Sequence, residues 1–106
     1  MSENPLLDTV LEMTAASVDR VDFSDEALML VRLAALVAVD APPASYLLNL
    51  GAAAGTDLTL EDARSVLIAV APIVGGPRVV SAAGNIASAL GLALDLAREE
   101  VEAEEA

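Results

Sequence analysis

Hydrophobic positions recur along this chain at helical spacing, and no stretch alternates between apolar and polar residues as a half-buried strand would. In residues 5–19 the large apolar side chains mostly fall on one stripe, as in an amphipathic helix. Asn4 stands at the N-cap position of this segment, Pro5 at its first helical position, and Asp8 near the positive end of its dipole. The pattern predicts a first helix over residues 5–19.

A second helix is predicted over residues 25–39, because Ser24 is a good N-cap residue and two acidic residues follow it in the first turn. From residue 28 to residue 39 the segment is apolar on every side except at Arg32. A helix that is apolar all round is normally buried all round. We therefore expect this helix to be buried on every side.

Prolines, glycines and one capping motif mark two further helices. Pro42-Pro43 breaks the chain and opens a third helix, which is expected to end between residues 51 and 55. Thr59 is the N-cap of a fourth helix, and Asp62 at its third position resembles a capping box. Apolar residues line the inner face of this fourth helix at Ala63, Val66, Leu67 and Val70.

The run Gly75-Gly76-Pro77 ends the fourth helix, and a fifth helix is predicted from residue 77 to about residue 97. Two glycines at a helix start could also form an anion-binding nest, but the P-loop spacing of lysine and Ser/Thr is missing, so we favour an ordinary turn. Small residues, which let two helix backbones approach closely, fill the middle of the fifth helix. They are Ser81, Ala82, Ala83, Gly84, Ala87, Ser88, Ala89 and Gly91. The acidic tail, about residues 99–106, puts negative charge at a helix C-terminus, and we expect it to fray.

The composition adds a problem of burial to this all-α pattern of about five helices. The chain has 106 residues, which predicts a single domain over residues 1–106, and 56% of them are hydrophobic. Ordinary domains are about 45–50% apolar with glycine counted, and a chain this short exposes much of its surface when it folds alone. Charged residues interrupt the apolar runs too often for a membrane span. We therefore expect a homo-oligomer and no membrane partner.

Charge and missing residue types exclude several classes of function. The net charge of −12 repels phosphate backbones, so no nucleic-acid partner is expected, and it favours solubility. Without cysteine or histidine the chain has no disulfide, no thiolate nucleophile and no usual zinc ligand set, although carboxylates could still bind a hard cation. We expect a cytoplasmic protein with no cofactor and no metal site.

Three pieces of sequence, taken in order, resemble the carboxymuconolactone decarboxylase family, which includes the alkylhydroperoxidase D-like proteins. They are LVRLAALVA at residues 30–38, AAAG at 52–55 followed by LTLED at 58–62, and IAVAPIVGGPR at 68–78, the last similar to the family's segment that ends in a Gly-x-Pro turn. The likeness spans residues 32–85, about half of the chain. It implies an all-helical subunit that assembles into trimers or hexamers.

The family's catalytic residues are not present in this chain. Redox members carry Cys-x2-Cys-x3-His, and counting back from the AAAG run places those positions on Asp40, Pro43 and Leu47. The activating glutamate of the family falls near Leu28, where the nearest acid is Glu26. Lactone-decarboxylating members use a histidine, which this chain also lacks. The resemblance therefore implies no catalytic residue here, and thiol peroxidase activity is excluded.

Three residues are candidates for a ligand pocket, each with a structural alternative. Arg32 could bind a ligand carboxylate, or form a buried ion pair with Glu61, Asp62 or an acid of a neighbouring subunit, and we favour the ion pair. Tyr46 and Asn49 share a helix face and could orient a small ligand. A lone tyrosine more often packs its ring and hydrogen-bonds its hydroxyl, so we favour that role for Tyr46.

The fifth helix supplies the candidate interface residues Arg78, Gly84, Asn85 and Ser88. Arg78 and Asn85 lie seven residues apart and so share a face. Arg78 also brings a cation to the positive end of its helix, which indicates either an acidic partner across an interface or an ordinary surface arginine.

Two functions fit the sequence. The first is a non-redox, non-catalytic member of the family that acts as an oligomeric scaffold or interaction module, and we favour it. The second is a small-molecule-binding protein or lactone decarboxylase-like enzyme that uses the three pocket candidates. Such an enzyme would need a general acid or base, and every acid near the buried segments also has a ready role at a helix start. These acids are Asp25, Glu26, Asp40, Glu61 and Asp62.

Overall fold

A computed structural model describes residues 3–53 and 58–105 of the chain. Within these residues there are helices and no strands, which confirms the all-α prediction. The helices are α1 (Pro5–Arg20), α2 (Asp25–Ala38), α3 (Pro43–Ala53), α4 (Leu60–Val74) and α5 (Gly76–Glu105). The predicted end of the third helix between residues 51 and 55 lies partly outside the described residues.

The first two helices begin at the predicted capping residues. The Asn4 side chain accepts a hydrogen bond from the backbone N–H of Leu7 at 3.0 Å, ahead of α1. Ser24 Oγ accepts one from the N–H of Ala27 at 3.1 Å, ahead of α2. Each bond satisfies an N–H group that the helix itself leaves without a partner.

Helix α4 begins with the capping box and ends at a glycine. Thr59 Oγ1 accepts from the N–H of Asp62 at 3.1 Å, and the Asp62 carboxylate accepts from the N–H of Thr59 at 2.9 Å. Gly75 then caps the C-terminus with a φ of 90°, which glycine adopts without a steric penalty. Because α5 begins at the next residue, α4 and α5 form a tight helical hairpin.

The fifth helix is longer than the sequence analysis predicts. It runs to Glu105, through the acidic tail that was expected to fray, instead of ending at about residue 97. Apart from Val101 the tail consists of two strong helix formers, glutamate and alanine, and their propensity outweighs the unfavourable charge at the C-terminus. Ala106 lies outside the described residues.

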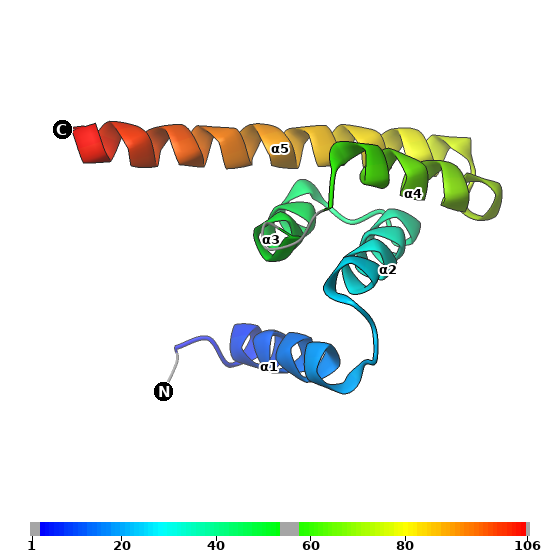
Figure 1. Cartoon of the computed structure of the whole chain (residues 1–106), viewed down its shortest axis with the longest axis horizontal. Coiled ribbons are helices and arrows are strands. Elements are labelled where there is room, and N and C mark those ends of the chain that lie inside the picture. The colour runs from blue at the N-terminus through cyan, green and yellow to red at the C-terminus, as the bar shows by residue number, and fades with distance from the viewer. Residues whose placement is uncertain (1–2, 54–57, 106) are drawn as a thin grey trace.

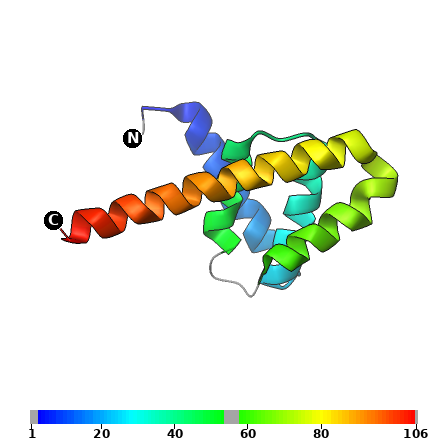
Figure 2. The ribbon, with the colours of Figure 1, turned by 90° about the horizontal axis from the view of Figure 1, so that it is seen from above.

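Helix α2 packs against α3 and against α4, and all three pack against the first half of α5, whereas the C-terminal part of α5 extends beyond them (Figures 1 and 2). Small residues of α5 face this packing, since Ala82 and Ala89 are fully buried. A core forms where Ala41, Tyr46 and Ala89 meet. Partly buried side chains complete it at Leu33, Leu36, Leu47 and Ile86.

Helix α1 lies apart from the other four helices, below α2 and α3 in Figure 1. It has no buried residue. Its apolar stripe, named the α1 stripe below, is exposed along its whole length. The stripe consists of Leu6, Leu7, Val10, Leu11, Met13 and Val18, each between 45% and 75% exposed.

Within one chain α2 is not buried on every side, contrary to the sequence expectation. Leu28, Met29 and Val37 are buried, but Val31 on the same helix is 52% exposed. The cause is that neighbouring helices cover only part of the circumference of α2 and leave Val31 half exposed.

The folded chain exposes more surface than its mass requires. Its accessible area is 7496 Å² for 10.8 kDa, whereas a folded monomer of that mass typically exposes about 5500 Å². The radius of gyration is 15.3 Å, against about 13 Å for an average compact domain of this length. The detached α1 and the protruding end of α5 account for this extended shape.

Helix α5 is also long and apolar enough, over Gly76–Glu104, to cross a membrane by length and composition alone. Core helices of soluble proteins, which are mostly buried, pass the same test, whereas 11% of this apolar window is buried. The same helix carries the face against which α3 and α4 pack. The expectation of no membrane partner therefore stays a prediction.

Candidate functional site

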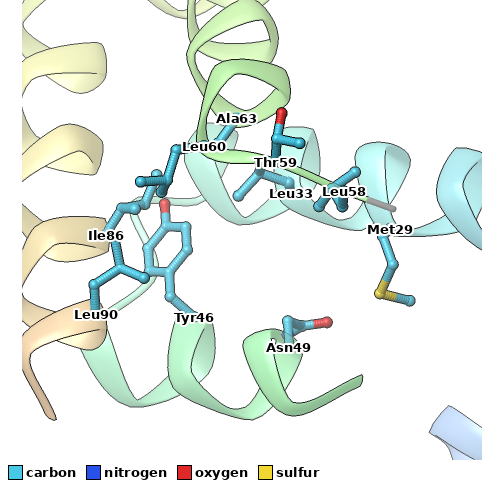
Figure 3. Close-up of a pocket in the computed structure, with 10 residues that line it drawn as sticks. All are labelled: Met29, Leu33, Tyr46, Asn49, Leu58, Thr59, Leu60, Ala63, Ile86 and Leu90. Carbon is cyan, nitrogen blue, oxygen red and sulfur yellow. The ribbon is translucent and has the colours of Figure 1, made fainter. Parts of the chain in front are cut away.

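A pocket of about 280 Å³ lies among α2, α3, α4 and α5 (Figure 3). Its walls are mainly aliphatic, with a single tyrosine, asparagine and threonine as polar members. The lining residues are Met29, Leu33, Tyr46, Asn49, Leu58, Thr59, Leu60, Ala63, Ile86 and Leu90. Two of the three predicted pocket residues, Tyr46 and Asn49, therefore line one cavity.

Tyr46 is 2% exposed, and its ring belongs to the core that α3 and α5 share. Its hydroxyl has no hydrogen-bond partner among the described residues. In Figure 3 the hydroxyl oxygen points toward the apolar side chains of α4 and α5. Burial raises the pKa of Tyr46 above its usual value, and the nearby carboxylate of Asp40 raises it further. The group is therefore a neutral, buried donor at physiological pH.

Asn49 lies one turn after Tyr46 on α3, which is why both reach the same cavity. Its Nδ2 donates to the backbone oxygen of Ser45 at 2.8 Å. That bond fixes the amide against its own helix. Asn49 therefore presents a positioned polar group at the pocket wall.

Arg32 does not line the pocket. Its Nη2 donates to Ser17 Oγ at 2.5 Å and to the backbone oxygen of Thr14 at 3.4 Å, so it joins α2 to α1. The predicted ion pair with Glu61 or Asp62 is not formed in the described part of the chain, where the one salt bridge joins Arg98 to Asp95.

The physical reason is that Arg32 is only half buried and needs no acid to offset desolvation, while the Asp62 carboxylate is already used in the capping box. Pairing of Arg32 with an acid of a neighbouring subunit stays a prediction.

Arg78 and Asn85 hold the corner between α2 and α3 from one face of α5. Arg78 Nη1 donates to the backbone oxygen of Ala38 at 2.5 Å, and Asn85 Nδ2 donates to that of Ala41 at 3.1 Å. Arg78 thus binds a carbonyl at the negative end of α2 instead of an acid. The two predicted interface residues use these donors within the chain, and their role between subunits stays a prediction.

A third bond at this corner was missed by the sequence analysis. Ser81 Oγ donates to Asp40 Oδ1 at 2.8 Å. Asp40 has a φ of 55°, a left-handed conformation that aspartate tolerates better than most residues. An aspartate directly after the last turn of α2 was the available signal for a corner there.

The other two predicted interface residues, Gly84 and Ser88, lie on the exposed side of α5. A Cβ atom added at Gly84 or at Gly91 would meet nothing within 4 Å. The two glycines on this side of α5 therefore leave open space within the same chain. We name the exposed positions Val80, Gly84, Ala87, Gly91 and Leu94 the outer face of α5.

The described part of the pocket lining offers no acid–base pair, and the pocket is suited to binding. Its polar members are two hydroxyls and an amide, and Thr59 Oγ1 already accepts a capping bond. Among the residues that the structure describes, no group of three or more His, Cys, Asp or Glu could hold a metal ion. The arrangement favours recognition of an apolar molecule over proton or group transfer.

Comparison with known proteins adds no assignment. No family model, no curated protein and no solved structure matches this chain. The likeness to the carboxymuconolactone decarboxylase family rests on the sequence pieces quoted above and stays a prediction.

Proposed function

We propose that this protein is a homo-oligomeric helical scaffold or interaction module that performs no redox chemistry. The observation that carries the proposal is the exposed area, about 2000 Å² more than a folded monomer of this mass typically shows. Standard protein interfaces bury about 800 Å² per partner, and obligate ones more. The excess is enough to supply an obligate interface on each subunit.

Two surfaces are the candidate contacts between subunits. The α1 stripe offers six large apolar side chains on a helix that buries nothing within its own chain. The outer face of α5 offers small residues between Val80 and Leu94, which are 73% and 67% exposed. Burial of apolar area at about 25 cal/mol per Å² favours covering both surfaces. The resemblance described above favours a trimer or a hexamer.

The first test is the molar mass of the full chain by size exclusion with light scattering, at micromolar protein and physiological salt. We expect a discrete multiple of 10.8 kDa that does not dissociate on moderate dilution. A stable, folded species at the monomer mass would refute the proposal.

Matched variants of α1 locate the interface. Leu11→Gln puts a polar group into the α1 stripe, whereas Glu12→Gln puts the same side chain at an exposed position opposite the centre of the stripe on the same helix. We expect Leu11→Gln to lower the oligomer mass at a given concentration and Glu12→Gln to leave it unchanged. Equal masses for both variants would show that the α1 stripe is not the contact.

The chemical part of the proposal has its own assay. The purified protein should consume no peroxide in a thiol-dependent assay, because the chain has no thiol to cycle. Turnover above a buffer control, retained in metal-free protein, would contradict this.

A further inference from the structure

We propose that the pocket among α2, α3, α4 and α5 binds a small, neutral, mostly apolar molecule whose carbonyl oxygen accepts a hydrogen bond from the Tyr46 hydroxyl. The proposal concerns a second function of the subunit and does not depend on how subunits assemble. Three properties of the pocket carry it: an unpartnered donor, apolar walls and the absence of a lining cation.

The Tyr46 hydroxyl is the first property. It is a buried donor without a partner among the described residues, and it belongs to a residue that lines the cavity. Buried polar groups in folded proteins nearly always have a hydrogen-bond partner, because an unpaired one loses its hydration without compensation. A ligand oxygen placed in the cavity supplies that partner.

The walls and the volume define the rest of the ligand. Leucine, isoleucine, methionine and alanine side chains line most of the pocket (Figure 3), so most of the ligand surface must be apolar. A volume of about 280 Å³ is at the small end of ligand pockets. Taking about 30 Å³ as the share of one water, it holds on the order of ten non-hydrogen atoms.

The charge of the lining disfavours an anionic ligand. No arginine lines the pocket: Arg32 and Arg78 are bonded to Ser17 and to the end of α2, and Arg64 lines the adjoining hollow between α4 and α5 instead. A carboxylate in this cavity would lose its hydration without a cation to replace it. The carboxylate of Asp40, which already raises the pKa of Tyr46, adds repulsion. A neutral ketone, ester or amide fits the pocket, and an acid does not.

Three probes of similar size separate these properties in the full-length protein. Acetophenone has an apolar body with a carbonyl acceptor, ethylbenzene lacks the acceptor, and benzoate carries a charge. Calorimetric titration gives the affinities, and amide chemical shifts show whether the pocket residues respond. We expect acetophenone to bind about 5- to 10-fold more tightly than ethylbenzene, the factor that a single net hydrogen bond supplies. We expect no binding of benzoate at the pocket.

Tyr46→Phe removes the donor and keeps the ring. It should weaken acetophenone binding about 5- to 10-fold and leave ethylbenzene binding unchanged, so that the two probes become equal. Equal binding of both probes to the unmodified protein would overturn the role of Tyr46, as would a preference for acetophenone that survives in Tyr46→Phe.

A second pair of variants tests the cavity itself. Ala63→Leu fills the pocket from α4, whereas Ala69→Leu adds the same atoms at an exposed position of α4 outside the lining. We expect Ala63→Leu to weaken all binding at least tenfold and Ala69→Leu to have no effect. Binding that survives in Ala63→Leu would place the probes elsewhere and overturn the proposal. Light scattering on each variant separates this result from a change in assembly.

Discussion

Helix α1 and the corner between α2 and α3 are each held by an arginine of another helix, but they differ in what lies beneath the polar contact. Arg32 reaches α1 through one hydroxyl and one carbonyl, and no residue of α1 is buried. Arg78 reaches the end of α2 beside the core in which Ala41 is 5% and Tyr46 is 2% exposed.

The difference shows how little a polar contact achieves without apolar burial. A typical intramolecular hydrogen bond contributes about 0.5–1.5 kcal/mol net, whereas fully burying one large aliphatic side chain contributes about 1.5–3 kcal/mol. The corner between α2 and α3 has both hydrogen bonds and apolar burial, whereas α1 has only hydrogen bonds to the rest of its own chain. Helix α1 is therefore the element most open to rearrangement or to a partner.

Two matched truncations should separate the regions most strongly. Val37→Ala removes methyl groups from a side chain that is 0% exposed, and should lower the free energy of unfolding by about 2 kcal/mol. Val10→Ala removes the same groups from the α1 stripe, 49% exposed, and should cost less than about 0.5 kcal/mol in the dissociated chain. Denaturant unfolding at several protein concentrations measures both.

If both variants lose the same free energy of unfolding at low protein concentration, α1 is packed as firmly as helices α2 to α5. A loss for Val10→Ala that appears only at high concentration would indicate that the α1 stripe is covered in the oligomer.

Tyr46→Phe should stabilise the packed helices α2 to α5, because it removes a buried hydroxyl that has no hydrogen-bond partner among the described residues. The expected gain in the free energy of unfolding is about 1 kcal/mol at neutral pH. If Tyr46→Phe instead lowers the free energy of unfolding by about 1 kcal/mol or more, the hydroxyl makes a hydrogen bond in solution. Thermal and denaturant unfolding of both proteins provide the measurement.

The same variant changes the response to alkaline pH. The folded pKa of Tyr46 lies above its ordinary value of 10.0, so the unfolded chain ionises first as the pH rises. The free energy of unfolding is therefore unaffected by this group below about pH 10 and falls as the pH rises toward the folded pKa. With no lysine, cysteine or histidine, Tyr46 is the only side chain that titrates between about pH 8 and about pH 12. The unfolding midpoint should fall above about pH 10 in the unmodified protein and stay flat in Tyr46→Phe.

A double-mutant cycle measures the link between α1 and α2. Arg32→Ala should cost about 1 kcal/mol, because it removes a charge-assisted bond that is half exposed. Ser17→Ala should cost less, and the coupling between the two should be about 0.5–1 kcal/mol. A loss of 3–5 kcal/mol for Arg32→Ala would instead indicate a buried ion pair with an acid of another subunit.

The smallest effect is expected at the acidic end of α5. Glu104→Arg replaces an unfavourable charge at the helix C-terminus with a favourable one, worth about 0.3–0.5 kcal/mol. Amide hydrogen exchange in the last turn of α5 should slow about twofold, with no change in helices α2 to α4. Unchanged exchange would show that helix propensity alone holds the tail.

Helix starts were predictable from the sequence because their causes are local. Asn4, Ser24 and the Thr59–Asp62 box each act within three residues of themselves, and all appear as predicted. The end of α5 was predicted wrongly because two local effects compete there, and dipole repulsion was given more weight than the propensity of alanine and glutamate.

The partners of the two arginines were not predictable, because they depend on how helices far apart in sequence meet. Arg78 lies 40 residues from Ala38, and Arg32 lies 15 from Ser17. Nothing in the sequence ranks a hydroxyl or a carbonyl above an acid as a partner. The pairing of Tyr46 with Asn49 in one cavity was predictable, because it follows from helical spacing alone.

The isolation of Tyr46 in the sequence also makes the protein its own optical probe. The chain contains one tyrosine, one phenylalanine and no tryptophan, so its near-ultraviolet absorption and its intrinsic emission come almost entirely from a single ring. That ring lies where α3 meets α5, and its near-ultraviolet circular dichroism reports on this packing alone. Separation of α3 from α5 can therefore be followed without any added label, while the far-ultraviolet signal follows all the helices at once.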